Sequence, residues 1–86
     1  MYYTYVLLCK DIKRKELYIG SCADLRNRVH EHKSGEVQTT KSFDSVVLVY
    51  YEACLNKTDA RKRELQLKTG FGRGYLKRRL ESYLKE

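Results

Sequence analysis

The beginning of the chain constrains the fold more than any other feature, because two strand-like segments there are joined by a short charged connection. Tyr2–Cys9 (YYTYVLLC) and Glu16–Gly20 (ELYIG) are both rich in aromatic and β-branched residues, which favours strands. The connection KDIKRK between them is too short for a crossover, so the two strands are expected to pair antiparallel. Each later element has to pack against this pair.

The middle of the chain predicts a helix and a third strand. The helix is expected from Ser21, with Ser21 or Asp24 as its N-cap and Gly35 as its end. Ser45–Cys54 (SVVLVYYEAC) is the strongest strand signal, and its nearly continuous apolar run predicts a central, well-buried strand. Gly20 can either end its own strand or let a ligand approach the backbone.

The C-terminal part predicts two more helices, the first of them capped by Asn56 or Thr58. The segment TGFGRG is expected to interrupt this helix, and YLKRRLESYLK forms the last one. An apolar stripe on that last helix consists of Leu76, Leu80, Tyr83 and Leu84. The order of elements predicts an α+β fold, within the broad α/β class. We expect a single domain over residues 1–86, with a small three-stranded antiparallel sheet flanked by helices.

The composition favours a nucleic-acid partner. The 86 residues include 18 Lys and Arg against 11 Asp and Glu, a formal net charge of +7, which suits a polyanion. A merely basic soluble protein is the alternative that charge alone leaves open. A membrane partner is not expected, because no segment approaches the roughly 20 apolar residues of a spanning helix. Three cysteines, an odd number, favour a reducing compartment, so the cytoplasm is the expected location.

Helical periodicity places two polar side chains beside the inward face of the first helix. Leu25 and Val29 define that face, and Arg28 and His32 lie at its edge, whereas His30 points into solvent. One interpretation makes Arg28 and His32 a boundary pair whose stems cover the edge of the core. The other makes them functional groups.

In the second helix a carboxylate falls among apolar residues. Ala60, Leu67 and Phe71 share a narrow arc, and Glu64 lies among them. A carboxylate in such a position is costly unless it is paired, hydrogen-bonded or bound to a metal. The alternative to a functional role is an ion pair with a neighbouring cation, which could be Arg61, Arg63 or Lys68.

The glycine-rich GFGRG lacks the preceding strand and the spacing of a dinucleotide-binding loop, so an interhelical turn is the simpler interpretation. Its glycines, before a basic helix, could still contact a phosphate. The remaining candidates are strand tyrosines, an arginine, a histidine and an inward glutamate. This set suits phosphodiester hydrolysis, because a phosphate needs a cation, a carboxylate can hold a hard metal ion, and a phenolate or histidine can deprotonate water.

These residues resemble the GIY-YIG nuclease superfamily. Tyr18-Ile19-Gly20 reproduces the YIG motif, and Tyr3-Thr4-Tyr5 stands in place of GIY, keeping only its tyrosine. The segments DLRNRVHEH, LVYYE and ARKRELQLK follow in order, as in small single-domain members similar to the nuclease module of the excinuclease C subunit. The chain departs from the family at Ser21, where some relatives have lysine. No asparagine follows Glu64, although many relatives have one there.

The resemblance implies roles for five residues. Tyr5 and Tyr18 would face a cleft from adjacent strands, one of them acting on the attacking water. Arg28 would bind the scissile phosphate, and His32 would assist the base or position the phosphate. Glu64 would hold a single divalent ion, Mg²⁺ or Mn²⁺.

The expected function is therefore a metal-dependent endonuclease that leaves a 5′-phosphate and a 3′-hydroxyl. DNA is the expected substrate, in repair or in the recognition of unusual structures. The cations expected to contact phosphates on the cleft rim are Lys41, Lys68 and Arg73. A non-catalytic nucleic-acid-binding module on the same scaffold is the alternative, and a basic structural protein bound to RNA is a third interpretation that rests on charge alone.

Overall fold

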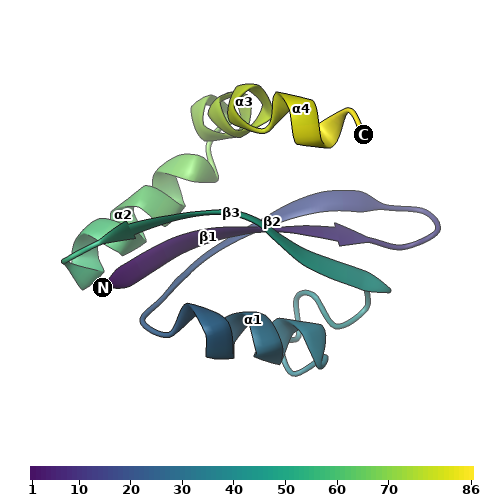
Figure 1. Ribbon diagram of the computed structural model, residues 1–86, viewed down its shortest axis with the longest axis horizontal. Helices are drawn as coiled ribbons and strands as arrows, with labels where there is room; N and C mark the ends of the chain where they lie inside the picture. The colour runs from purple at the N-terminus through teal and green to yellow at the C-terminus, as the bar shows by residue number, and fades with distance from the viewer.

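A computed structural model describes residues 1–86 and consists of one antiparallel sheet with helices on both faces. Figure 1 shows α1 on one side of the sheet and α2, α3 and α4 on the other. The strands are β1 (Tyr2–Lys10), β2 (Lys15–Cys22) and β3 (Ser45–Cys54), and the helices are α1 (Leu25–Lys33), α2 (Lys57–Leu67), α3 (Gly70–Arg79) and α4 (Glu81–Leu84). The expected α+β architecture, with a three-stranded antiparallel sheet flanked by helices, is confirmed.

The strand order β2-β1-β3 places β1 in the centre of the sheet. The prediction that Ser45–Cys54 is the central, well-buried strand was therefore wrong. β3 is an edge strand with only one neighbour, and its residues are either partly buried or exposed, none of them fully buried. β1 instead is buried continuously from Thr4 to Cys9, because helices cover both of its faces. Both strands contain a continuous apolar run, and the sequence alone did not show which of them has helices on both faces.

The alternation of side chains along β1 produces two small cores. Val6 packs with Ile19, Leu67 and Leu76 on the face covered by α2 and α3. Tyr5, Leu7 and Cys9 form the second cluster on the opposite face, where partly buried residues of α1 and of the neighbouring strands cover it. Tyr5 and Val6 thus point to opposite sides of the sheet.

Side-chain caps fix where the first two long helices begin. Asp24 caps α1 by accepting a hydrogen bond from the backbone N–H of Asn27, and Asn56 caps α2 by accepting from Thr58 and Asp59. Each is one of the two N-caps predicted for its helix. β2 runs on to Cys22, so Ser21 belongs to the strand and does not start the helix. Gly35, with φ of 79°, follows the end of α1 as expected.

The glycine-rich segment opens α3 and is not a turn between helices, which corrects the prediction. Thr69 is the N-cap, and its side chain accepts a hydrogen bond from the backbone N–H of Gly72. Gly72 is buried, and a Cβ placed there would overlap the backbone of Gln66 and Leu67 at the end of α2. Phe71 lies in this segment and is 64% exposed, so its predicted place in the inward arc of the second helix was wrong.

The C-terminal segment is two helices, because α3 ends at Arg79 and a separate short helix, α4, follows Leu80. Leu76 and Leu80 of the predicted stripe are buried, whereas Tyr83 is 42% exposed. None of the helices has the length and apolar character needed to cross a bilayer.

The close approach of α2 and α3 makes a prediction about two neighbouring glycines. Gly72→Ala should lower the free energy of unfolding by about 1–3 kcal/mol, because the added methyl overlaps backbone that cannot rotate away. Gly70→Ala is the matched control: it lies in the same helix turn, its Cβ meets nothing within 4 Å, and alanine is the better helix former. Urea unfolding curves measure both. Equal stability of the two variants would contradict this account of the packing.

Candidate active site

The site is organised around the phenol oxygen of Tyr5, which lies against the backbone of the neighbouring strand. Tyr5 is buried in β1 and pairs in register with Gly20 of β2. A Cβ at position 20 would lie 2.6 Å from Cζ of Tyr5 and would overlap its hydroxyl oxygen. Gly20 neither ends its strand nor leaves its backbone open to a ligand, because Tyr5 fills that space.

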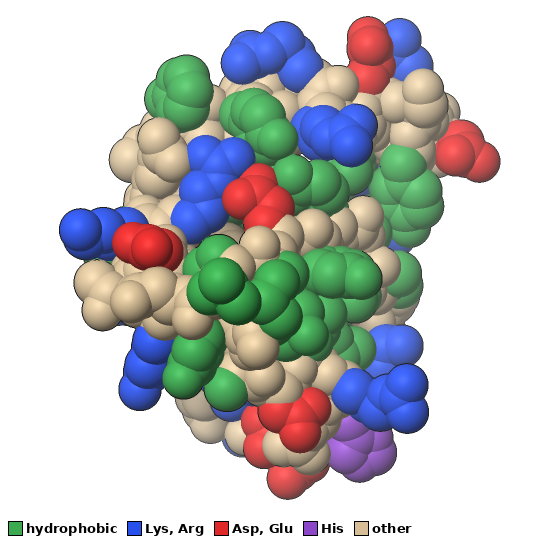
Figure 2. Space-filling model, turned by 60° about the vertical axis from the view of Figure 1, so that its left-hand side comes forward, with side chains coloured by type: hydrophobic (Ala, Val, Ile, Leu, Met, Phe, Trp, Pro, Cys, Tyr) green, Lys and Arg blue, Asp and Glu red, His purple; other side chains and the backbone are tan.

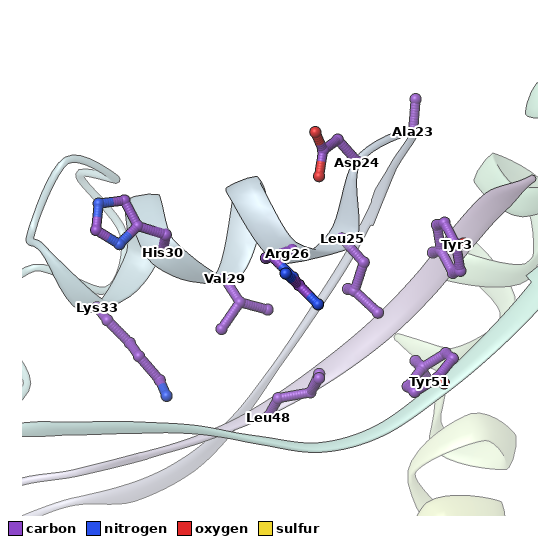
Figure 3. Close-up of a pocket in the computed structure, with 10 residues that line it drawn as sticks. All are labelled: Tyr3, Ala23, Asp24, Leu25, Arg26, Val29, His30, Lys33, Leu48 and Tyr51. Atoms are coloured by element: carbon purple, nitrogen blue, oxygen red, sulfur yellow. The ribbon is translucent and has the colours of Figure 1, made fainter.

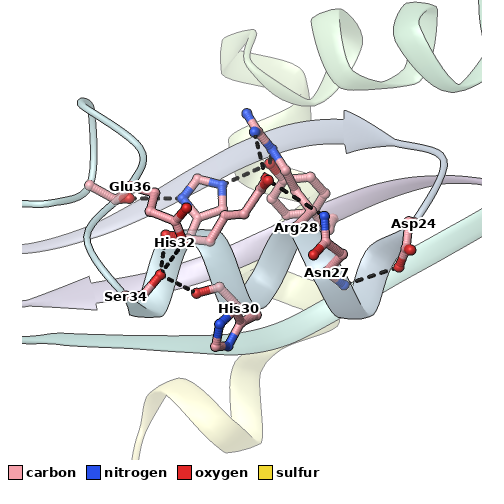
Figure 4. A network of polar contacts seen from close by, with 10 residues as sticks. Asp24, Asn27, Arg28, His30, His32, Ser34 and Glu36 are labelled. Atoms are coloured by element: carbon pink, nitrogen blue, oxygen red, sulfur yellow. Dashed lines mark hydrogen bonds and ion pairs between the residues drawn. The ribbon is translucent and has the colours of Figure 1, made fainter.

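A chain of hydrogen bonds passes through this oxygen and links four residues. The Arg28 Nε–H donates to Tyr5 Oη over 3.3 Å, and Tyr5 Oη lies 2.9 Å from His32 Nε2. His32 Nδ1 lies 2.7 Å from Thr40 Oγ1. The tautomer that provides an acceptor for the Tyr5 hydroxyl proton has Nε2 unprotonated, so that Tyr5 donates to Nε2 and the Nδ1–H donates to Thr40 Oγ1. Figure 4 shows Arg28 and His32 on the same side of α1.

His32 lies deeper than the sequence predicted. It is 1% exposed and is the only fully buried residue of α1, so its placement at the edge of the buried face was wrong. The depth is explained by Thr40, a buried hydroxyl in the polar loop after α1, which supplies a partner for Nδ1. Sequence reasoning missed Thr40, because nothing in the segment EVQTTKSFD distinguishes it from its neighbours. His30 is exposed, as expected, and points away from the network (Figure 4).

Burial and charge set the protonation states of the network. Burial raises the pKa of Tyr5 to about 12, although the hydrogen bond from Arg28 opposes this shift. Burial, together with the nearby charge of Arg28, lowers the pKa of His32. The hydrogen bond to Tyr5 raises the pKa of Arg28 further above neutrality. At pH 7 the network therefore holds a protonated phenol, a neutral imidazole and a charged guanidinium.

Tyr18 extends the network toward solvent. Its ring centroid is 4.9 Å from that of His32, and its side chain is only partly buried. Tyr18 is also among the residues that line a groove of about 620 Å³ between β2 and α3. We call it the β2 groove, and its basic lining residues are Lys15, Lys68, Arg73 and Lys77. Of the two tyrosines, Tyr18 is therefore the one that borders this groove, although its ring packs on the α1 face beside His32.

Glu64 lies on the other face of the sheet, on α2, and is 5% exposed. Its Oε1 accepts from Ser21 Oγ at 2.7 Å and pairs with Arg61 at 2.8 Å, and its Oε2 pairs with Lys68 Nζ at 2.7 Å. Burial alone would raise the pKa of Glu64, but the hydrogen bonds from Lys68, Ser21 and Arg61 outweigh it and hold this pKa below its usual value. The inward placement is confirmed, and so are two of the three possible ion pairs. Arg63 pairs instead with Glu52.

The structure thus brings four of the five predicted residues together on the α1 face of the sheet, and it places the fifth, Glu64, on the opposite face. The Tyr5–Gly20 pairing and the Ser21–Glu64 hydrogen bond fall on consecutive residues of β2, on opposite faces of the sheet. No strand lies beyond β2, so both faces are accessible from its outer edge. A ligand in the β2 groove could approach Tyr18 and the Glu64 partner Lys68 at the same time.

The three cations expected on the rim separate into two places. Lys68 and Arg73 both line the β2 groove. Lys41 lies elsewhere, in a smaller cavity of about 310 Å³ that also includes His32 and Thr40. Lys15 and Lys77, which the sequence analysis did not single out, join Lys68 and Arg73 because the fold places the start of β2 beside α3.

The donor atoms at Glu64 suit a hard divalent cation. A carboxylate and the Ser21 hydroxyl are oxygen ligands, and an ion such as Mg²⁺ keeps several waters, so few protein ligands suffice. No cluster of three or more His, Cys, Asp or Glu side chains exists that could form an all-protein cage. Lys68 and Arg61 form ion pairs with the Glu64 carboxylate, but about half of each side chain is exposed, so both can move away when an ion binds.

The chain is similar to known proteins over most of its length. Residues 1–78 match the family model described as GIY-YIG catalytic domain. A UPF0213 protein of Staphylococcus haemolyticus is 36% identical over 69 residues, which cover 79% of this chain and 80% of the relative. A UPF0213 protein of Pediococcus pentosaceus is 40% identical over 68 residues, or 78% and 68% of the two chains. No solved structure gave a significant match.

The burial of neutral His32 predicts how stability depends on pH. The unfolded chain binds a proton near the usual histidine pKa of 6.5, whereas the folded chain resists protonation, so stability is lost as the pH falls from about 7 to 5. His32→Gln should lose less stability over this interval than the wild type, whatever its stability at pH 7. His30→Gln, an exposed control, should keep the wild-type dependence. Urea unfolding at several pH values measures the slopes, and equal slopes for all three proteins would contradict the prediction.

Proposed function

This chain belongs to the GIY-YIG catalytic domain family, and from this membership we propose that it is a divalent-metal-dependent endonuclease that hydrolyses phosphodiester bonds. The family implies a nuclease-type function on nucleic acid, and its nucleases generally use divalent metal ions. The observation that carries the proposal is the hydrogen-bonded chain Arg28–Tyr5–His32 on the α1 face of the sheet, with buried Glu64 hydrogen-bonded to Ser21 of β2 on the other face.

Arg28 is the proposed ligand of the scissile phosphate. Its Nε donates to Tyr5 and its Nη1 to Glu31, and its Nη2 makes no hydrogen bond to the protein. The guanidinium is therefore held on one side and free to donate on the other. A fixed cation of this kind stabilises the negative charge that develops on phosphate oxygens in the transition state, without having to reorganise.

Tyr18 is the proposed contact of the attacking water, because it is the less buried of the two phenols beside His32. Tyr5 and His32 are buried, so we assign them a positioning role. Tyr5 fixes the guanidinium of Arg28, and the His32 ring packs edge-on against Tyr18. His32 is kept neutral by its burial, and it can therefore accept the hydrogen bond from Tyr5 without placing a second positive charge beside Arg28.

Glu64, with Ser21, is the proposed holder of the divalent ion, Mg²⁺ or Mn²⁺. When bound, such an ion polarises a phosphate oxygen and lowers the pKa of its bound water. Lys68 is then released from Glu64, and it remains in the β2 groove as a cation for the substrate. The carboxylate is already ionised before metal arrives, because its three hydrogen-bond donors keep its pKa low.

The proposed substrate is DNA, in repair or in the recognition of unusual structures. Phosphates would contact Lys68 and Arg73 in the β2 groove, with Lys41 near the other end of the Tyr5 network. The proposed location is the cytoplasm, since the three cysteines are free thiols. The second candidate function is a nucleic-acid-binding module without catalysis, which the ion-paired state of Glu64 favours.

Two substitutions separate the two candidate functions. Arg28→Ala should lower the cleavage rate by a factor of about 10² or more, the usual effect of losing a transition-state donor. Glu64→Gln should abolish cleavage while nucleic-acid binding persists, and it should also lose stability, because Lys68 and Arg61 lose their ionised partner. Purified proteins are incubated with labelled DNA and RNA in duplex, branched and single-stranded forms, with Mg²⁺, with Mn²⁺ or with EDTA.

Glu81→Gln is the matched control, since this exposed α4 glutamate pairs only with Lys85 and should leave both activity and binding unchanged. An active Glu64→Gln protein would contradict the metal assignment. A wild type that binds these nucleic acids but cleaves none of them, with either metal, would support the binding module instead.

The β2 groove makes a prediction about salt. Binding should weaken steeply as salt rises, because each phosphate contact releases counterions. Lys77→Ala and Arg73→Ala should each reduce the slope of log affinity against log salt by about one unit. Fluorescence anisotropy with a labelled oligonucleotide at four salt concentrations measures the slopes. An affinity that does not change with salt would exclude phosphate contacts in this groove.

A further inference from the structure

A second groove lies on the opposite flank of α1, between this helix and β3, and the proposed nuclease chemistry leaves it unused. Its volume is about 750 Å³, and its apolar lining consists of Tyr3, Ala23, Leu25, Val29, Leu48 and Tyr51. Figure 3 shows Leu25 and Val29 of α1 above Leu48, with the rings of Tyr3 and Tyr51 beyond the beginning of the helix. We call it the β3 groove.

Two tyrosine rings form an open aromatic platform in the β3 groove. Tyr3 and Tyr51 lie on adjacent strands with ring centroids 6.0 Å apart and an angle of 65° between the rings. Tyr51 is 52% exposed, although it is a large aromatic residue on a sheet. Tyr5, two residues further along the same strand as Tyr3, is buried on the face that α1 covers. The part of the sheet that carries Tyr3 and Tyr51 lies beyond this cover and borders the open groove.

Cations border the platform, and none of the protein's carboxylates neutralises them. Arg26 and Lys33 line the β3 groove from α1 and take part in no ion pair, and His30 lies between them. The single acidic residue there, Asp24, accepts a hydrogen bond from the backbone of Asn27 as the cap of the helix. Figure 2 shows one face of the molecule on which hydrophobic side chains form a band bordered by charged groups and a histidine.

We propose that the β3 groove binds an unpaired segment of nucleic acid. Bases would stack on Tyr51 and Tyr3, and the backbone phosphates would contact Arg26 and Lys33. Exposed aromatic rings beside free cations are the elements that recognise single strands, because every base has a face that can stack and every nucleotide carries a phosphate. A duplex offers its phosphates but hides the faces of its bases.

This inference rests on the proposed function only in taking nucleic acid as the partner. It narrows the substrate to nucleic acids that contain an unpaired segment. Arg28 and the β3 groove lie on opposite flanks of the same helix, and the groove reaches Ala23 and Asp24, just after the end of β2. A substrate with an unpaired segment could therefore contact the groove while its duplex part lies along β2. Junctions, flaps and loops have this form.

The test compares oligonucleotides that differ only in their bases. Anisotropy at low salt measures the affinity of the full chain, with Glu64→Gln as the background to prevent cleavage, for a labelled dT 12-mer, a U 12-mer, an abasic 12-mer and a duplex. Tyr51→Ala should weaken binding of the dT or U 12-mer by about tenfold or more, the effect of losing one stacked base, and should leave the duplex and abasic affinities within twofold. Tyr51→Phe should retain the single-strand affinity.

Tyr83→Ala is the matched control, because Tyr83 is also about half exposed but lies on α4, away from the β3 groove. Circular dichroism and sedimentation check the fold and the oligomeric state of each variant. Equal losses for the single strand and the duplex, or no loss for either, would overturn the proposal. A change from dimer to monomer in Tyr51→Ala would also overturn it and assign the groove to self-association. Failure of the Glu64→Gln background protein to bind any of the four probes would count instead against the proposed function.

Discussion

The placement of one buried phenol oxygen determines how the rest of the candidate site is arranged. Tyr5 Oη lies in the space that a side chain at position 20 would occupy, and it reaches both Arg28 and His32 from there. A buried hydroxyl has to be hydrogen-bonded, and in this chain every buried side-chain nitrogen or oxygen has a partner. Position 20 must therefore be glycine, because Tyr5 of the neighbouring strand fills the space of a side chain there. Arg28 and His32 of α1 then supply the hydrogen-bond partners of the buried Tyr5 hydroxyl.

The edge position of β2 explains how residues from both faces of the sheet can belong to one site. Alternation along β2 directs Tyr18 and Gly20 toward the face of α1, and Ile19 and Ser21 toward α2 and α3. In a central strand these two sets would be separated by neighbouring strands. At an edge, a substrate can lie along the strand and contact side chains on either side. An unpaired edge strand can pair with a strand of another chain, and charged side chains on the edge oppose such pairing. Lys15 and Glu16 of β2 suit that purpose.

Local signals in the sequence predicted most elements of the fold and one feature of the candidate site, but not how deeply the other candidate residues are buried. Caps at Asp24 and Asn56 and the inward position of Glu64 follow from patterns within a few residues. The central strand and the buried state of His32 depend on contacts between distant segments. His32 is buried because Thr40 and Tyr5 satisfy its two ring nitrogens, and helical periodicity contains no information about either partner. Gly72 was mistaken for part of a turn, since a glycine required for helix packing looks the same in sequence as one required for a bend.

The central claim is that Arg28 and Glu64, on opposite faces of the sheet, act on one phosphodiester bond. Single-turnover cleavage rates at raised Mn²⁺ for the wild type, Arg28→Ala, Glu64→Asp, which keeps a carboxylate, and the double variant measure their coupling directly. Groups that act as a unit are strongly non-additive, so the double variant should be no slower than the slower single variant. Losses that multiply, with each substitution reducing the rate by the same factor in either background, would contradict a shared site.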